Sequence, residues 1–592
     1  MSKEHLATFI IERSAKFGSK VALRRKVSGE WQETTYTDFI RQARAIAAAL
    51  LGRGIARHDR VGIFSDNRPE WAITDLAALI AFATSVPIYA TNTGEQTRYI
   101  VDDSGLRILF VGNQEQLEHA RPLLGRSSLE LIVTYDELGE QGDNRIITFS
   151  DFLAEGEAQE LDERLDANLA QGDTEDLVTI IYTSGTTGEP KGVMLSHANL
   201  FHQFHTIDED FDVGPEDRSL SFLPLSHVFE RVWCYYLFVK GASVSFLDDP
   251  RNVLELFADV RPTAMCSVPR LFEKIYSTAH AKVEKAPPHR RAIFNWAIQT
   301  GSRYQYATRQ GTAGPMLRFQ HRLADRLVLS KVRNIVGGPK KFLAAGGAKL
   351  AQNIEEFFLA CGILVCQGYG LTETSPTLSV NRPHDFLFGT VGKPVKGVEV
   401  KIAADGEIIV RGPNIMKGYW NKPEATREVL TEDGWFSTGD IGELDDRGFL
   451  RITDRKKDLI ITSGGKNIAP QHIETVLRQD FYIEQLVAIG DDRKFISALV
   501  VPNFPALEEW AREQGLTYTN RDELVALPRV HALYQQRIET GNQQLAQYER
   551  VKKFHIMPAE FTQATGEVTA TLKTRRKFVN QKYATIIDQI YA

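Results

Sequence analysis

The stretch Leu177-Val-Thr-Ile-Ile-Tyr-Thr-Ser-Gly-Thr-Thr-Gly-Glu-Pro-Lys-Gly192 carries the most information about both the fold and the site. It opens with an apolar, β-branched run of the kind that forms buried strands. The loop that follows holds four hydroxyl residues, two glycines and Lys191. Glycine lets backbone amides converge on an anion, and the hydroxyls and the lysine add further donors. The stretch therefore predicts a strand that ends in a phosphate-binding loop.

This loop differs from a Walker A loop, which needs Gly-x4-Gly-Lys-[Ser/Thr]. Pro190 precedes Lys191 and Gly192 follows it, so both flanking positions fail. A purely structural turn is the plain alternative, but so many donors within ten residues favour anion binding. The predicted phosphate ligands are Thr183, Ser184, Gly185, Thr186, Thr187, Gly188 and Lys191.

Similar apolar runs recur along the chain and alternate with longer helical patterns. Residues 60–65, 107–111 and 362–366 are such runs, and each ends near small or polar residues. This alternation predicts an α/β fold with substantially parallel sheets. Around residues 395–411 the strands become closely spaced, with turns at Gly397 and Asp405-Gly406. We expect a small antiparallel, β-barrel-like unit there.

Length and composition bound the class of protein. The chain has 592 residues, 43% of them apolar, with 70 Lys and Arg against 76 Asp and Glu, which gives a net charge of −6. These values are ordinary for a folded protein of several domain-sized units, so disorder, collagen-like repeats and a disulfide scaffold are excluded. The acidic balance gives no reason to expect nucleic acid as a partner.

The sequence also bears on compartment. Cys234, Cys266, Cys361 and Cys366 show no C-x-x-C spacing, so we expect buried free thiols rather than a zinc site. The first twenty residues lack the apolar core of a signal peptide, and no apolar stretch reaches the length of a membrane span. We expect a cytoplasmic protein, with peripheral contact at the inner face of the membrane left open.

Residues 279–333 differ from the rest in being rich in Ala, Arg, Gln and Leu. The helical spacing of Ile293, Trp296 and Ala297 predicts amphipathic helices. We expect them to pack against the main domain.

The loop at residues 182–192 resembles the phosphate-loop signature of the ANL adenylate-forming superfamily, which includes acyl-CoA synthetases, peptide-synthetase adenylation domains and luciferases. Further motifs that resemble those of the family follow in the expected order, over most of the chain from about residue 20 to 577. The resemblance implies a large N-terminal domain of layered α/β subdomains over residues 1–456. It also implies a smaller, mobile α+β domain over residues 457–592.

Two motifs resemble the family's adenine pocket. Residues 344–349 hold Gly346, Gly347 and Ala348, a bare backbone surface that a flat ring can approach. The octapeptide at residues 367–374 reads Gln-Gly-Tyr-Gly-Leu-Thr-Glu-Thr and offers a tyrosine face for stacking. The resemblance assigns Gln367, Gly368, Tyr369 and Gly370 to nucleotide binding.

The same octapeptide carries candidate catalytic residues. Thr372 can donate to the α-phosphate, and Glu373 supplies the hard oxygen that Mg²⁺ prefers. In the family this glutamate and the first threonine of the loop, here Thr183, hold the metal. Asp440 matches the aspartate that accepts the ribose hydroxyls, and Arg455 resembles the arginine that contacts the ribose.

Several segments favour the long-chain fatty-acid–CoA ligase branch. The run from residue 433 to 457 resembles the fatty-acyl-CoA-synthetase signature, and residues 223–230 resemble an acyl-pocket segment with His227 near the reacting carboxylate. The helical insertion before residue 333 is similar to that of long-chain and bubblegum-type members. His227 is either a catalytic residue or a packing residue.

The expected C-terminal Gly-Lys pair is absent, because Glu567 follows Gly566. Long-chain members show a segment similar to Gly-x-x-Thr-x-Thr-x-Lys, which puts Lys573 in the place of the adenylation lysine; a solvated basic face is the alternative. The resemblance also places the domain hinge at Lys457. It assigns Gly464 and Gly465 to the pantetheine channel of coenzyme A.

Together these motifs predict ligation of a long-chain fatty acid to coenzyme A with ATP and Mg²⁺, through an acyl-adenylate, with release of AMP and pyrophosphate. The alternatives are a fatty-acyl-AMP ligase that loads a carrier protein, a luciferase-like oxygenase, and a non-catalytic acyl- or nucleotide-binding relative. Chain length, saturation preference and oligomeric state are left open by the sequence.

Overall fold

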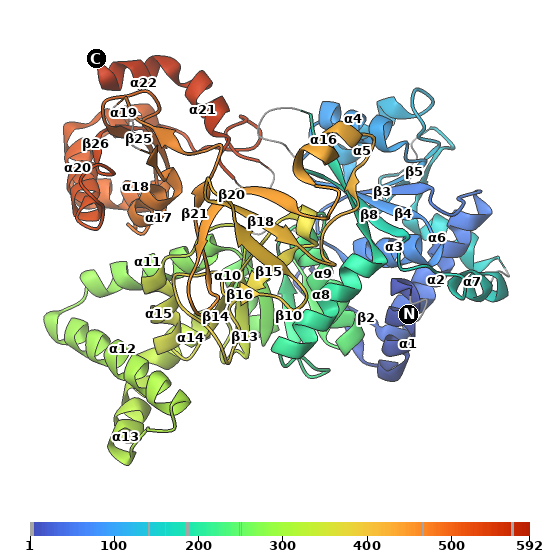
Figure 1. Ribbon diagram of the computed structural model, residues 1–592, viewed down its shortest axis with the longest axis horizontal. Helices are drawn as coiled ribbons and strands as arrows, with labels where there is room; N and C mark the ends of the chain where they lie inside the picture. The colour runs from blue at the N-terminus through green and yellow to red at the C-terminus, as the bar shows by residue number, and fades with distance from the viewer. Residues whose placement is uncertain are drawn as a thin grey trace.

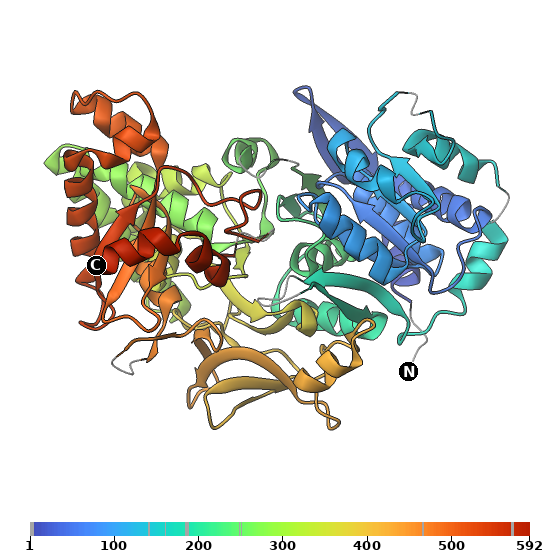
Figure 2. The ribbon, with the colours of Figure 1, turned by 90° about the horizontal axis from the view of Figure 1, so that it is seen from above.

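The computed structural model describes residues 5–139, 142–159, 162–183, 189–247, 249, 252–463, 467–569 and 573–592. Figure 1 shows a large assembly of sheets and helices with a smaller C-terminal group of strands and helices beside it. In the view from above in Figure 2, the C-terminal group lies at the left, the largest sheet at the right and a small sheet between them. The expected α/β class is confirmed.

The largest sheet has eight strands in the order β19-β9-β8-β4-β3-β5-β6-β7. The six strands from β8 to β7 run parallel, whereas β9 pairs antiparallel with both β8 and β19. The strands are β3 (Arg60–Phe64), β4 (Thr84–Ile88), β5 (Ile108–Val111), β6 (Leu131–Thr134), β7 (Ile146–Thr148), β8 (Leu177–Thr183), β9 (Lys191–Ser196) and β19 (Gly418–Tyr419). Its helices include α2 (Tyr36–Gly52), α3 (Pro69–Ile80), α4 (Gly94–Ser104), α5 (Gln114–Ala120) and α6 (Phe149–Glu157).

Two further sheets complete the layered body. The first has the order β10-β11-β1-β2, with β1 (Val21–Val27), β2 (Glu30–Thr35), β10 (Arg218–Ser221) and β11 (Ser243–Phe246). The second has the order β12-β13-β14-β15-β16, with β12 (Ala264–Ser267), β13 (Phe342–Ala345), β14 (Val365–Gly370), β15 (Thr377–Val380) and β16 (Lys393–Pro394). Neighbouring helices are α8 (His197–Asp210), α9 (Val228–Lys240), α10 (Val253–Val260) and α15 (Gln352–Ala360).

The strand expected at residues 362–366 is displaced toward the C-terminus. β14 begins at Val365 and continues to Gly370, because Gly368 and Tyr369 pair antiparallel with β15. The sequence pattern could not reveal this extension, since the added residues are polar or small and their partner strand lies beyond the next turn. Residues 367–370 of the predicted nucleotide motif are thus held in a sheet.

The antiparallel unit expected around residues 395–411 is a four-stranded sheet of order β17-β18-β20-β21. Its strands are β17 (Glu399–Ile402), β18 (Glu407–Arg411), β20 (Phe436–Leu444) and β21 (Leu450–Arg455). The turn between β17 and β18 contains Gly406 with φ +85°, a conformation that favours glycine.

The C-terminal group contains a three-stranded sheet of β24 (Ile483–Ile489), β25 (Ile496–Pro502) and β26 (Val551–Ile556). A short pair, β22 (Ile460–Ile461) and β23 (Asn467–Ile468), precedes it. Its helices are α17 (Pro470–Leu477), α18 (Phe504–Glu513), α19 (Arg521–Ala526), α20 (Pro528–Asn542), α21 (Arg576–Lys582) and α22 (Ala584–Tyr591). The group has apolar clusters of its own, as a separate folding unit requires.

The insertion is helical, as expected, with α11 (Pro269–Glu284), α12 (Pro288–Arg309), α13 (Pro315–Ala324) and α14 (Ser330–Ile335). Its buried face differs by one residue from the expected one: Phe294 and Ala297 are buried, whereas Ile293 is 39% exposed. The close approach of α12 to α15 explains the shift. A Cβ at Gly301 would lie 2.2 Å from the carbonyl oxygen of Ala360, so the helix turns its small residues toward α15.

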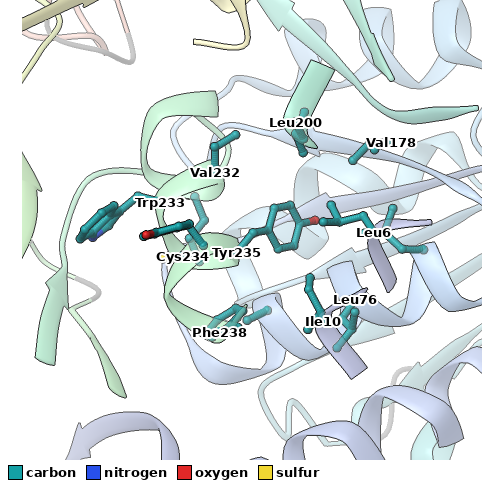
Figure 3. Close-up of a cluster of buried hydrophobic side chains, with 14 of the residues drawn as sticks. Leu6, Ile10, Leu76, Val178, Leu200, Val232, Trp233, Cys234, Tyr235 and Phe238 are labelled. Atoms are coloured by element: carbon teal, nitrogen blue, oxygen red, sulfur yellow. The ribbon is translucent and has the colours of Figure 1, made fainter. Parts of the chain in front are cut away.

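A buried apolar cluster joins α9 to the N-terminal helices. Figure 3 shows side chains of α9, such as Val232 and Phe238, beside Leu6 and Ile10 of α1 (Leu6–Ser14) and Leu76 of α3. Burial of each such side chain contributes about 1.5–3 kcal/mol. The cluster fixes α9 and therefore its N-terminal residue, His227, relative to the main sheet.

An ion pair crosses this core. Nη2 of Arg231 lies 2.6 Å from Oδ1 of Asp75, and the two side chains are 3% and 1% exposed. Nη1 of Arg231 donates to Oγ1 of Thr179 across 2.7 Å. Helices α9 and α3 are thereby tied to β8, the strand that leads into the predicted phosphate loop.

All four cysteines are buried free thiols, which confirms the expectation. Among the described residues, we find no helix with the length and apolar character needed to cross a membrane.

Candidate functional site

The predicted phosphate loop lies between two paired strands. β8 ends at Thr183 and β9 begins at Lys191, and these two residues are antiparallel partners. Oγ1 of Thr183 donates weakly to the carbonyl of Lys191 across 3.5 Å. The predicted ligands Ser184, Gly185, Thr186, Thr187 and Gly188 lie outside the described residues. The structure therefore fixes the two ends of the loop side by side on β8 and β9, the strands next to the edge strand β19.

Lys191 and Glu373 meet through Tyr419. Nζ of Lys191 lies 4.9 Å from the centre of the Tyr419 ring, and the phenol of Tyr419 donates to Oε1 of Glu373 across 2.9 Å. Burial and the nearby Glu373 carboxylate raise the pKa of Tyr419, so the phenol stays protonated and acts as a donor. Sequence reasoning missed Tyr419. The sequence around Tyr419 gives little indication of this role, because Tyr419 reaches the site only through the pairing of β19 with β9.

A second set of contacts joins β14 to the small antiparallel sheet. The phenol of Tyr369 donates to Oδ2 of Asp440 across 2.5 Å, and Nε of Arg455 donates to Oδ1 of the same carboxylate across 3.0 Å. Asp440 is 6% exposed. Burial and the Asp440 carboxylate raise the pKa of Tyr369. Three residues predicted from separate motifs are thus brought together.

The turn after β14 is shaped by close packing. A Cβ at Gly370 would lie 1.7 Å from the carbonyl oxygen of Pro376, so only glycine fits at this position. The chain then forms a short 3₁₀ turn over Thr372–Thr374. This turn holds Thr372 largely buried and leaves Glu373 half-buried beside Tyr419.

The predicted adenine wall adjoins the end of β13. Gly346 is buried, and a Cβ there would lie 3.1 Å from the Phe229 ring; Gly347, with φ +87°, and Ala348 are exposed. Gln367 acts here as a clamp, because its Oε1 accepts from the backbone nitrogen of Leu350 across 2.9 Å. Its side chain therefore positions the wall. Gly368, beside it, lies on the strand paired with β15.

His227 caps the N-terminus of α9. Its Nδ1 accepts a hydrogen bond from the backbone nitrogen of Phe229 across 3.2 Å. Burial and the positive charge of Lys573 lower the pKa of His227 to about 4. The ring is neutral at pH 7, with its proton on Nε2, because Nδ1 is occupied as an acceptor. It can donate a hydrogen bond, but it is poorly arranged to act as a base.

Lys573 belongs to the C-terminal group. The surrounding protein and the positive charge of Arg455 lower the pKa of Lys573, while Asp440 and Glu373 act in the opposite direction. The side chain still reaches solvent. The charges of Glu373 and Asp440 act on Lys573, and the charge of Lys573 acts on His227. Gly464 and Gly465 lie outside the described residues.

The residues present suit a magnesium ion carried by a nucleotide. Thr183 and Glu373 offer one hydroxyl and one carboxylate, and they are linked through Lys191 and Tyr419. In the described part of the chain, no three His, Cys, Asp or Glu side chains gather in a way that could hold a metal. Mg²⁺ commonly binds through one or two protein oxygens together with substrate phosphates and water, so this donor set fits.

Comparison with known families gives two matches in succession. A family described as AMP-binding enzyme matches residues 11–420, and one described as AMP-binding enzyme C-terminal domain matches residues 457–592. The first match alone covers more than half of the chain.

Individual relatives match over nearly the whole length. The long-chain-fatty-acid–CoA ligase FadD15 of Mycobacterium bovis is 38% identical over 99% of this chain and 97% of its own. Fatty acyl-CoA synthetase A of Dictyostelium discoideum is 32% identical over 95% of this chain and 86% of its own.

Solved structures share the fold. The adenylation domain of a carboxylate reductase from Mycobacterium chelonae aligns with TM-score 0.80 and 21% identity, covering 100% of this chain and 92% of that one. The anthranilate CoA ligase AuaEII, in complex with anthranoyl-AMP, aligns with TM-score 0.73 and 20% identity, covering 99% and 98%.

Proposed function

Because this chain belongs to the AMP-binding enzyme family of the ANL adenylate-forming superfamily, we propose that it is an ATP-dependent ligase that joins a long-chain fatty acid to coenzyme A. The relatives described as fatty-acid–CoA ligases support the substrate class. The observation that carries the proposal is the hydrogen-bonded cluster of Tyr369, Asp440 and Arg455, because it joins residues of two separate nucleotide motifs.

In the first half-reaction a carboxylate oxygen of the fatty acid attacks the α-phosphorus of ATP, and pyrophosphate leaves. Asp440 and Arg455 hold the ribose, and Tyr369 lies against the adenine. Thr372 donates to the α-phosphate. Lys573 places a compact positive charge between the fatty carboxylate and the phosphate, where negative charge develops.

Thr183 and Glu373 would hold Mg²⁺, with Tyr419 fixing the orientation of the carboxylate. When bound, the ion neutralises charge on the phosphates of ATP. Lys191 and the glycine-rich loop that precedes it provide the remaining contacts to the departing pyrophosphate.

In the second half-reaction the thiolate of coenzyme A attacks the acyl carbon of the acyl-adenylate, and AMP leaves. We place the domain boundary between residues 456 and 457 and the pivot at Lys457. Rotation there carries Lys573 away and brings Gly464 and Gly465 toward the thiol channel. Hinge residues at the ends of elements absorb such changes, and Lys457 lies in the turn directly after β21.

His227 has a non-catalytic role in this scheme. Its acceptor nitrogen is occupied by the start of α9, so we assign it to shaping the entrance to the acyl pocket next to Phe229. We also propose that the enzyme acts in the cytoplasm and reaches the inner face of the membrane as a peripheral protein.

The decisive experiment separates the half-reactions. Purified protein is given ATP, Mg²⁺ and free fatty acids from short to very long, and pyrophosphate exchange and AMP release are measured with and without coenzyme A. We expect exchange that requires the fatty acid, and AMP release that requires coenzyme A and yields one acyl-CoA for each AMP. AMP release only with a carrier protein would instead identify a fatty-acyl-AMP ligase, and absence of exchange would exclude an enzyme.

A further inference from the structure

The helices α12 to α14 form a projection with an unusual charge. Figure 1 shows them at the lower left, with α13 at the tip. Between residues 288 and 335 there are nine Arg or Lys residues and one acidic residue, Asp325, in a chain whose net charge is −6. Asp325 is already paired with Arg333, with 2.6 Å between Oδ1 and Nη2. The projection is therefore strongly positive.

The tip of the projection also exposes large apolar side chains. Met316 and Phe319 are 68% and 64% exposed, the highest values among the exposed large apolar side chains of the described residues. Leu323 and Leu327, 44% and 40% exposed, continue the row. Met316, Phe319 and Leu323 are three and four residues apart in α13 and so form an apolar stripe on one face of the helix. Leu327 lies in the π-helical segment Asp325–Leu329 that continues α13.

Arginines border the stripe. Arg318, Arg322 and Arg326 are exposed, and within the described part of the chain no carboxylate lies within 4.0 Å of their guanidinium groups. The opposite face of α13 is fixed to the protein, because Ala324 is fully buried and His321 stacks on Tyr304 at 3.8 Å between ring centres. The apolar and basic face is thus held outward by packing.

We propose that one surface docks on an anionic phospholipid membrane. This surface, named here the α13 face, is made of Met316, Arg318, Phe319, Arg322 and Leu323 of α13 and of Arg326 and Leu327 of the π-helical segment that follows it. Apolar side chains enter the boundary between headgroups and acyl chains, and the arginines contact lipid phosphates. A polyanion such as a nucleic acid would satisfy the arginines but leave the apolar stripe in water. A second copy of the chain would bury the stripe but bring like charges together.

The docking surface itself is independent of the proposed reaction. Its advantage rests on the proposed function, because long-chain fatty acids partition into membranes and an enzyme held there meets a concentrated substrate.

The test is flotation of the full-length protein with vesicles, in low salt and in 0.5 M NaCl. One set of vesicles contains phosphatidylglycerol in phosphatidylcholine, and the other contains phosphatidylcholine alone. Two variants remove the two parts of the surface. The apolar variant carries Met316→Ser, Phe319→Ser and Leu323→Ser, and the charge variant carries Arg318→Glu, Arg322→Glu and Arg326→Glu.

Matched controls make the same changes at exposed positions elsewhere. The apolar control carries Ile402→Ser, Leu444→Ser and Tyr548→Ser, and the charge control carries Arg427→Glu, Arg447→Glu and Arg512→Glu. Circular dichroism melting curves establish that every variant is folded.

We expect the wild type and both controls to float with the anionic vesicles. Each α13 variant should lose at least ten-fold in partitioning, and salt or neutral vesicles should weaken wild-type binding. Equal flotation of the wild type and the α13 variants would overturn the proposal. So would a wild type that fails to float but dimerises, or binds a polyanion, through the same residues. Flotation of a protein that lacks ligase activity would contradict the proposed function and leave the docking surface intact.

Discussion

The phenol of Tyr419 donates a 2.9 Å hydrogen bond to Oε1 of Glu373, and so links β19, at the edge of the eight-stranded sheet, to the turn after β14. A carboxylate held in this way offers its second oxygen in a fixed direction. Tyr419 thus positions the carboxylate that we propose as a Mg²⁺ ligand.

We predict that Tyr419→Phe raises the Mg²⁺ concentration needed for half-maximal acyl-adenylate formation, with little loss of rate at saturating Mg²⁺. The lost bond is charge-assisted and worth about 1.5–3 kcal/mol, part of which water recovers. Glu373→Gln should lose most of the activity at every Mg²⁺ concentration. A Mg²⁺ titration of pyrophosphate exchange distinguishes the two variants, and an unchanged midpoint in Tyr419→Phe would remove its positioning role.

For Lys573, we predict a split between the half-reactions. Lys573→Ala should abolish acyl-adenylate synthesis from ATP but largely retain thioester formation from supplied acyl-adenylate, because the lysine is proposed to act only on the first step. Lys577→Ala is the control, since Lys577 is an exposed neighbour on the same segment. If Lys573→Ala retains acyl-adenylate synthesis, Lys573 is not the lysine that acts in this step.

The pivot can be tested by restricting the backbone. Lys457→Pro fixes φ near −65° and should impair thioester formation more than adenylation, whereas Lys457→Ala should leave both intact. Rotation must also break contacts between the domains, such as the 2.8 Å hydrogen bond from Asn353 to Gln479 and the ion pair of Arg270 with Glu484. Equal loss of both half-reactions in the proline variant would place the pivot at another residue.

We predict that breaking the buried ion pair of Asp75 and Arg231 greatly lowers the stability of the protein. Asp75→Asn leaves the guanidinium without its counter-charge, which costs about 3–5 kcal/mol of the free energy of unfolding in comparable buried pairs. Asp143→Asn removes the partner of Arg145 at the surface and should leave the unfolding midpoint unchanged. Urea unfolding measures both, and similar midpoints for the two variants would contradict the argument.

Because the pKa of Glu567 is lowered in the folded protein, we predict that stability depends on pH. Burial opposes its ionisation, but hydrogen bonds from Lys582, Thr565 and Tyr583 outweigh burial and lower its pKa to about 2. The unfolded chain titrates near 4.5, so the stabilisation is complete above that pH and is lost as the pH falls toward 2. The difference in melting temperature between wild type and Glu567→Gln should be constant from pH 7 to 5 and shrink below 4.5. A difference independent of pH would refute this.

The sequence predicts those parts of the site that lie in continuous motifs. The strand before the phosphate loop and the antiparallel turn at Gly406 follow local patterns, and the structure confirms both. Tyr419 could not be predicted in the same way, because its contact with Glu373 depends on β19 joining the far edge of a sheet. The predicted buried face of α12 was wrong by one residue. The close approach of Gly301 to Ala360 sets the rotation of this helix about its axis, and no local pattern reveals that contact.

That approach of Gly301 to Ala360 also has a mechanical consequence. α15, which carries Ala360, leads through a short turn into β14, so the backbone of α12 packs directly against the unit that bears Tyr369. Figure 1 shows α13 at the lower end of the molecule and the C-terminal group at the upper end. If the α13 face binds a membrane, the large domain with its proposed nucleotide site would be immobilised relative to the bilayer. Only the C-terminal group would then rotate between the two half-reactions, and it would do so in solvent.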